Sequence, residues 1–90
     1  MQRFTDRTVI VTGSSKGIGA AIARRFAQEG ANVVLNSRSR DDLESVASDL
    51  DDARTLLVEG DVSDVAFAKE LVARTVERFG GLDCLVNNAG

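Results

Sequence analysis

The chain has 90 residues, of which 43% are hydrophobic and 28% are charged, and its formal net charge is −3 at pH 7. This composition predicts one globular domain with a modest core and argues against intrinsic disorder. The acidic balance argues against nucleic acid or a membrane surface as a partner, and no apolar stretch approaches the roughly 18 residues that a membrane span requires.

Short apolar runs alternate along the chain with amphipathic stretches at helical spacing. The apolar runs are four residues long and predict strands that are buried on both faces. The amphipathic stretches between them predict helices. The predicted elements, in chain order, are a strand at 8–11, a helix at 18–29, a strand at 32–35, a helix at 39–50, a strand at 55–58, a helix at 63–79 and a strand at 83–86.

Residues with known preferences for helix ends mark the boundaries of these helices. Gly30 is the expected C-cap of the first helix. Ser39 is the expected N-cap of the second, with Asp42 three residues later as a capping-box-like partner. Ser63 is the expected N-cap of the third, with Asp64 in its first turn.

This alternation predicts an α/β fold of the Rossmann type, a doubly wound parallel sheet with strand order 3-2-1-4. The first two helices are expected on one face and the third on the other. The chain would then change direction between strands one and four, and the loops after Val11 and Val86 would open into a crevice there. We expect residues 1–90 to be the N-terminal half of a single domain, truncated after strand four, whose exposed apolar edge would make the free chain associate.

A glycine-rich loop lies between the first predicted strand and the first helix. Gly13, Gly17 and Gly19 are spaced G-x3-G-x-G, and Ile18 and Gly19 stand where a P-loop would need glycine and lysine. Backbone N–H groups at a helix start suit a phosphate or pyrophosphate, whereas the alternative is an ordinary loop. The predicted cofactor-binding residues of this loop are Gly13, Ser14, Ser15, Lys16, Gly17, Ile18 and Gly19.

The end of the second predicted strand indicates which cofactor is bound. An NAD site places an acidic residue here for the ribose 2′-hydroxyl, but no acid occurs before Asp41. Arg38 can bind a 2′-phosphate through two charge-assisted hydrogen bonds, Ser37 can add another, and Lys16 brings a second positive charge. The alternative is that Arg38 and Lys16 are ordinary solvated charges. We predict NADP(H) as the cofactor.

The loops after strands three and four carry the remaining candidate residues. Asp61 can accept a hydrogen bond from an adenine amino group beside the Val62 backbone, or it can be a simple turn or capping acid. The amides of Asn87 and Asn88 can tie neighbouring strand ends together. The single cysteine, Cys84, fits a reducing cytoplasm and is expected to be a small core residue, not a reactive thiol.

Together these motifs resemble the short-chain dehydrogenase/reductase family, over essentially the whole chain. The matching segments are Thr12–Gly19, Asp61-Val62 and Asn87-Asn88-Ala89-Gly90, in the family's order and spacing. The resemblance implies that the first segment wraps the pyrophosphate and adenosine ribose, that Arg38 selects NADP and that Asp61 and Val62 hold adenine. It further implies that Asn87, Ala89 and Gly90 line the ribose pocket.

The sequence departs from the family where catalysis is concerned. The family uses a Ser, an Asn and a Tyr-x-x-x-Lys beyond the segment matched here, and this chain contains no Tyr and no His. We therefore predict no catalytic residue and no metal site within it. The resemblance implies the NADP(H)-binding part of an oxidoreductase acting on a carbonyl or secondary alcohol, inactive by itself and a homo-oligomer when intact. A non-catalytic NADP-binding sensor or regulatory module is the alternative.

Overall fold

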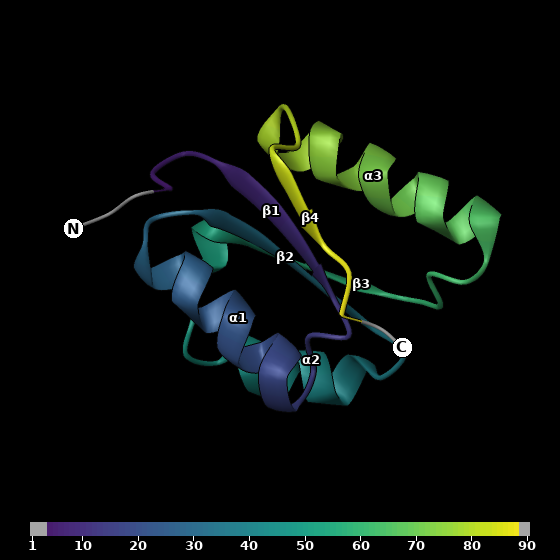
Figure 1. Ribbon diagram of the computed structural model, residues 1–90, viewed down its shortest axis with the longest axis horizontal. Coiled ribbons are helices and arrows are strands. Elements are labelled where there is room, and N and C mark those ends of the chain that lie inside the picture. The colour runs from purple at the N-terminus through teal and green to yellow at the C-terminus, as the bar shows by residue number, and fades with distance from the viewer. Residues whose placement is uncertain (1–3, 89–90) are drawn as a thin grey trace.

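The computed structural model describes residues 4–88 and contains a parallel four-stranded sheet with helices on both faces (Figure 1). The strand order is β3-β2-β1-β4, which confirms the predicted 3-2-1-4 arrangement. The elements are β1 (Thr8–Thr12), α1 (Gly17–Gln28), β2 (Asn32–Ser37), α2 (Arg40–Ala47), the 3-10 helix η1 (Asp52–Arg54), β3 (Thr55–Glu59), α3 (Val65–Phe79) and β4 (Cys84–Val86).

Strand β1 lies at the centre of the sheet and is completely buried. In its register with the neighbouring strands, Val9 pairs with Val33 of β2 and Cys84 of β4. Side chains alternate between the two faces along a strand, so this register sorts the apolar residues into two separate clusters.

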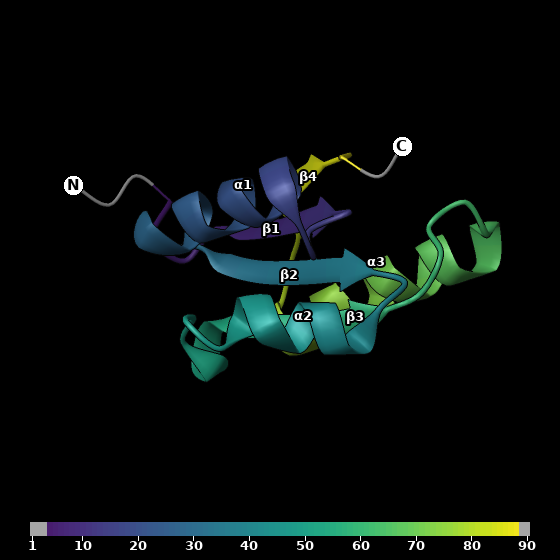
Figure 2. The ribbon, with the colours of Figure 1, turned by 90° about the horizontal axis from the view of Figure 1, so that it is seen from below.

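The first cluster lies between the sheet and helices α1 and α2. Figure 2, seen from the side of these helices, shows β2 running between them. The buried members of the cluster are Val9, Val11, Ala20, Ala23, Ala31, Val33, Leu35, Leu43 and Val46. Half-buried Cys84 packs against this cluster, in agreement with its expected place in the core.

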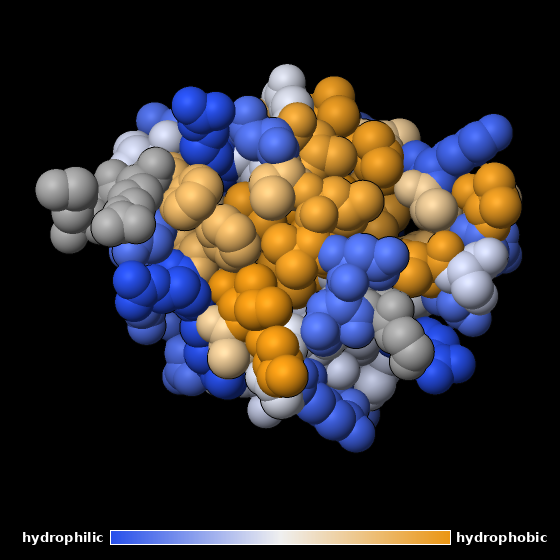
Figure 3. Space-filling model, in the orientation of Figure 1, coloured by the Kyte–Doolittle hydropathy of each residue, from blue (hydrophilic) through white to orange (hydrophobic). Residues whose placement is uncertain are grey.

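The second cluster lies between the sheet and α3. Its buried members are Ile10, Val34, Val58 and Leu71. Much of the remaining apolar surface on this side is exposed, and Figure 3 shows it extending over β4 and α3. The large apolar residues of these two elements that are exposed are Val65, Val72, Val76 and Leu85.

The N-cap of helix α3 lies one residue later than the sequence predicts. Its N-cap is Asp64, whose carboxylate accepts hydrogen bonds from the backbone N–H groups of Ala66 at 2.9 Å and Phe67 at 3.3 Å. The prediction that Ser63 caps this helix is therefore wrong. The Ser63 hydroxyl instead donates to Asp61 at 2.7 Å in the preceding turn, while the Asp64 carboxylate accepts from the first N–H groups of the helix.

Helix α2 ends at Ala47, three residues before the predicted end at Leu50. After Ser48 the chain closes a tighter turn, in which the Leu50 N–H donates to the Ala47 carbonyl at 2.9 Å. This turn still places Leu50 against the first cluster. Across residues 4–88, no helix has the length and apolar character needed to cross a membrane.

Candidate nucleotide-binding site

A cleft of about 760 Å³ lies at the carboxyl ends of the strands, formed by the loops that follow all four of them. A parallel sheet binds ligands at this edge, at the point where the chain changes direction. The lining residues are Gly13, Ser15, Lys16, Asn36, Ser37, Arg38, Ser39, Asp42, Gly60, Asp61, Val62, Ser63, Asn87 and Asn88.

Most of the predicted cofactor-binding residues with described positions line this cleft. They are Gly13, Ser15, Lys16, Ser37, Arg38, Asp61, Val62 and Asn87. Ser14, Gly17, Ile18 and Gly19 are not among the lining residues. Ala89 and Gly90 lie outside the described residues.

Ser14 fixes the glycine-rich loop to the end of β2. Its side chain is fully buried, and its Oγ accepts a hydrogen bond from the Asn36 N–H at 2.9 Å. The Ser14 N–H in turn donates to the Asn36 carbonyl at 3.0 Å. The Ser14 hydroxyl is thus hydrogen-bonded inside the protein, and Ser14 stabilises the conformation of the loop without lining the cleft.

The glycines at the start of α1 are required for two different reasons. Gly17 begins the helix at a φ of +54°, a left-handed conformation that favours glycine. Gly19 lies so close to the carbonyl oxygen of Gly13 and to Asn88 that a Cβ there would collide with both. The helix start is therefore packed directly against the loop and the end of β4. Between these glycines, the side chain of Ile18 is 74% exposed.

Side-chain hydrogen bonds join the ends of β1 and β4. The Thr12 hydroxyl contacts Asn87 Oδ1 at 3.2 Å and accepts from the Asn88 N–H at 3.0 Å. The Asn88 amide donates to the Gly13 carbonyl at 3.2 Å. The prediction that Asn87 and Asn88 tie neighbouring strand ends is confirmed.

Asn36 forms a similar bridge on the other side of the cleft, from β2 to β3. Its buried amide donates to the Val58 carbonyl at 2.9 Å and to the Gly60 carbonyl at 3.3 Å. The sequence prediction gave Asn36 no role, although a polar residue that directly follows an apolar strand was a usable signal. The carboxyl ends of all four strands are therefore held together by polar side chains.

Lys16 and Arg38 bring two positive charges to the cleft, and each faces an acid. Lys16 Nζ lies 3.9 Å from Asp42 Oδ2. Hydrogen bonds from the Ser63 hydroxyl and backbone N–H, together with the nearby charge of Arg38, hold the pKa of Asp61 below its usual value of 3.8. Both of these hydrogen bonds use Asp61 Oδ1, so Asp61 forms the turn that the predicted alternative gave it, and it also lines the cleft.

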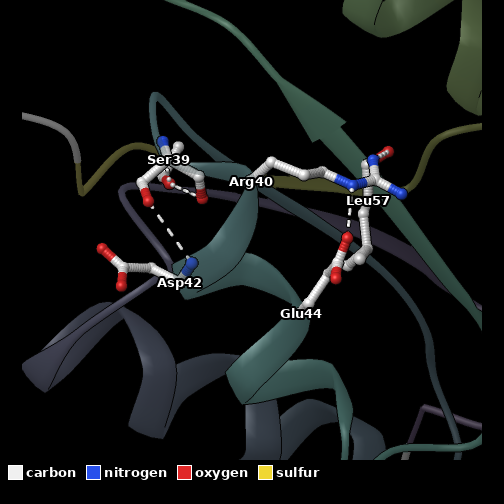
Figure 4. A network of polar contacts seen from close by, with 6 residues as sticks. Ser39, Arg40, Asp42, Glu44 and Leu57 are labelled. Atoms are coloured by element: carbon white, nitrogen blue, oxygen red, sulfur yellow. Dashed lines mark hydrogen bonds and ion pairs between the residues drawn. The ribbon is translucent and has the colours of Figure 1, made fainter.

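The neighbouring Arg40 points to a different part of the surface. Its Nε lies 3.2 Å from Glu44 Oε1, and its Nη1 donates to the Leu57 carbonyl at 3.3 Å (Figure 4). Of these two arginines, only Arg38 lines the cleft.

Ser39 is the N-cap of α2, as predicted, and its Oγ accepts from the Asp42 N–H at 3.3 Å (Figure 4). The reciprocal half of the predicted capping box is absent, because the Ser39 N–H donates to Ser37 Oγ at 3.1 Å. The Asp42 carboxylate is left to pair with Lys16, a contact that the sequence prediction missed. Within the described part of the chain, no group of three or more His, Cys, Asp or Glu could hold a metal ion.

The sequence pattern of the short chain dehydrogenase family matches residues 7–90. The chain is 43% identical to rat L-fucose dehydrogenase (Rattus norvegicus) over 88 residues, covering 98% of this chain and 32% of that protein. It is 46% identical to glucose 1-dehydrogenase of Gluconobacter oxydans over 91 residues, covering 98% of this chain and 34% of that protein.

The fold has equally similar counterparts among solved structures. Glucose dehydrogenase of Caenorhabditis elegans in its apo form matches with a TM-score of 0.91 and 41% identity, over 98% of this chain and 39% of that one. A short-chain dehydrogenase/reductase from the same organism, solved with its cofactor, matches with a TM-score of 0.84 and 38% identity, over 91% of this chain and 32% of that one.

The chain thus spans about a third of the length of the curated relatives it matches. The matched third carries the glycine-rich loop and the cleft, and members of this family bind a nicotinamide cofactor. The chain belongs to the short-chain dehydrogenase family.

Proposed function

We propose that this chain is the NADP(H)-binding part of an oxidoreductase that transfers a hydride between NADP(H) and a carbonyl or secondary alcohol. The relatives support the reaction class, since two of them are named dehydrogenases of sugars. The site residues also fit a dinucleotide, because the cleft combines a glycine-rich loop, hydrogen-bonding side chains and two cations. When bound, the cofactor would supply the hydride donor or acceptor.

The preference for NADP(H) depends on one observation: Lys16, Ser37 and Arg38 line the same cleft. A 2′-phosphate is strongly anionic and has oxygens that a guanidinium can bind in pairs. Ser37 offers no carboxylate that would repel it. Arg38 is therefore assigned to the 2′-phosphate, with Lys16 as the second positive charge.

The other lining residues would position the rest of the cofactor. The backbone of Gly13, Ser15 and Lys16 would face the phosphates at the start of α1, where N–H groups and the helix dipole favour anions. Asp61 and the Val62 backbone would receive adenine, with Asp61 Oδ2 as the acceptor. Asn87 would face the ribose at the end of β4, next to Ala89 and Gly90 in sequence.

We place proton transfer and substrate binding outside these 90 residues. The chain has no Tyr and no His to exchange a proton with a substrate oxygen near neutral pH. The same absence favours the second candidate, a non-catalytic NADP-binding module. Incubating the chain with NADPH and a set of ketones cannot distinguish the two candidate functions, because each of them predicts that these 90 residues alone show no turnover. Turnover would instead contradict the proposal that the catalytic residues lie outside these 90 residues.

We further propose that the intact enzyme is cytoplasmic and forms a homo-oligomer.

The test of NADP(H) selection compares Arg38→Ala with Arg40→Ala in the intact protein. Arg38→Ala should weaken NADPH binding by about 1.5–3 kcal/mol, the range for hydrogen bonds to a charged group, and leave NADH binding nearly unchanged. Arg40→Ala removes the same charge from a side chain that points away from the cleft, and should affect neither cofactor. Equal losses for NADPH and NADH in Arg38→Ala would rule out Arg38 as the selecting residue.

A further inference from the structure

The carboxylate of Asp42 enters the cleft from the first turn of α2 and lies 3.9 Å from Lys16 Nζ. Its neighbour Asp41 lies in the same turn, is exposed and is not a lining residue. One of two adjacent acids therefore faces the cation that the proposed function assigns to the 2′-phosphate.

The fold does not use the Asp42 carboxylate for helix capping. In a capping box this carboxylate would accept from the Ser39 N–H, but that N–H is already bonded to Ser37 Oγ. Only the backbone N–H of Asp42 takes part, by donating to Ser39 Oγ. The carboxylate is thus free to contact Lys16.

The ion pair is weak enough to be displaced. The side chains of Lys16 and Asp42 are 80% and 42% exposed, and exposed pairs of this kind contribute little stability. A phosphate bearing about two negative charges would compete effectively for Lys16. The negative charge of Asp42 would nevertheless remain beside the bound phosphate and oppose it.

We propose that Asp42 is a specificity-determining residue that competes with the cofactor's 2′-phosphate for Lys16 and so limits the preference for NADP(H) over NAD(H). This inference depends on the proposed function, because it requires that the 2′-phosphate binds beside Lys16. Without the phosphate, Asp42 is the anion that pairs with Lys16, and this pair must break before Lys16 can contact the phosphate.

The test compares Asp42→Asn with its matched control Asp41→Asn, which makes the same charge change in the same helical turn. Binding of adenosine 2′,5′-bisphosphate and of 5′-AMP to the intact protein would be measured by calorimetry. Asp42→Asn should bind the bisphosphate about 3–10-fold more tightly and 5′-AMP within about twofold of the wild type. Asp41→Asn should bind both within about twofold of the wild type.

A second pair of variants tests whether Asp42 acts through Lys16. In a Lys16→Met background, the gain from Asp42→Asn should fall to about half or less, because Asp42 and the phosphate no longer compete for Lys16. An unchanged bisphosphate preference in Asp42→Asn, or an equal gain in Asp41→Asn, would overturn the inference while leaving the proposed function intact. A wild type that binds 5′-AMP as tightly as the bisphosphate would overturn both. Melting curves would confirm that each variant is folded.

Discussion

The two faces of the sheet differ in how completely they are covered. On the face of α1 and α2, Leu35 and Leu43 are fully buried among branched and small side chains. On the face of α3, the buried cluster is smaller, and Val72 and Val76 remain more than one-third exposed. Leu85 of the edge strand β4 is 55% exposed.

Because of this difference, the loops that form the cleft are attached to the rest of the protein in two ways. The glycine-rich loop and the end of β2 are attached to the well-covered face through Ser14 and the start of α1. The loop containing Asp61 leads into α3, on the less covered face. Since the face of α3 is less well buried, we expect local opening to be easier at the Asp61 loop than at the glycine-rich loop.

The largest effect on stability is expected from shortening a leucine to alanine, and we compare this change on the two faces of the sheet. Leu35→Ala should lower the free energy of unfolding by about 3–5 kcal/mol, because it leaves a cavity in the buried strand β2. Leu85→Ala, also in a strand but half exposed, should cost less than about 1 kcal/mol. Urea denaturation measures both, and equal losses would show that the two faces are equally well packed.

A smaller effect is expected where the helix start meets the loop. Gly19→Ala should destabilise the fold by about 1–3 kcal/mol, because its Cβ would overlap the Gly13 carbonyl oxygen and force the loop to move. Gly81→Ala is the matched control, since a Cβ there meets nothing within 4 Å. Thermal melts of both variants would test this, and a neutral Gly19→Ala would contradict the close packing.

The smallest effect is expected at Asp61, on the less covered side. The Ser63 hydroxyl is the main cause of its lowered pKa, so Ser63→Ala should raise that pKa toward 3.8. Since the pKa of Asp61 is lowered in the folded state, its charge stabilises the fold above pH 3.8, and this contribution is lost as the pH falls through the lowered value. NMR titration of the Asp61 carboxyl would measure the shift.

Ser48→Ala provides the control for that titration. The Ser48 hydroxyl donates to the Ser45 carbonyl at 2.8 Å, within α2 and its C-terminal turn, so its removal should leave the Asp61 pKa unchanged. An Asp61 pKa that does not respond to Ser63→Ala would contradict the hydrogen bond.

Much of the fold could be predicted because local pattern and tertiary structure agree. The predicted strand at 32–35 corresponds to β2, which runs two residues further to Ser37. That extension was not predictable from hydropathy, since Asn36 and Ser37 are polar. They continue the strand because backbone pairing with Val58 and Glu59 of β3 holds them there.

The candidate site was predictable as a set of loops, but not in how its side chains divide their contacts. Spacing placed Lys16 and Arg38 in one neighbourhood, and the structure brings both to the same cleft. The spacing in the sequence could not show that Asp42 would contact Lys16 instead of completing a capping box. That outcome depends on Ser37, whose Oγ accepts the hydrogen bond from the Ser39 N–H that Asp42 would accept in a capping box.

The central claim is tested most directly by a crystal structure of the protein with NADP⁺ bound. The account predicts the 2′-phosphate within hydrogen-bonding distance of the Arg38 guanidinium, with Lys16 turned from Asp42 toward it. A cofactor bound elsewhere, or one whose 2′-phosphate is contacted by neither Lys16 nor Arg38, would contradict it.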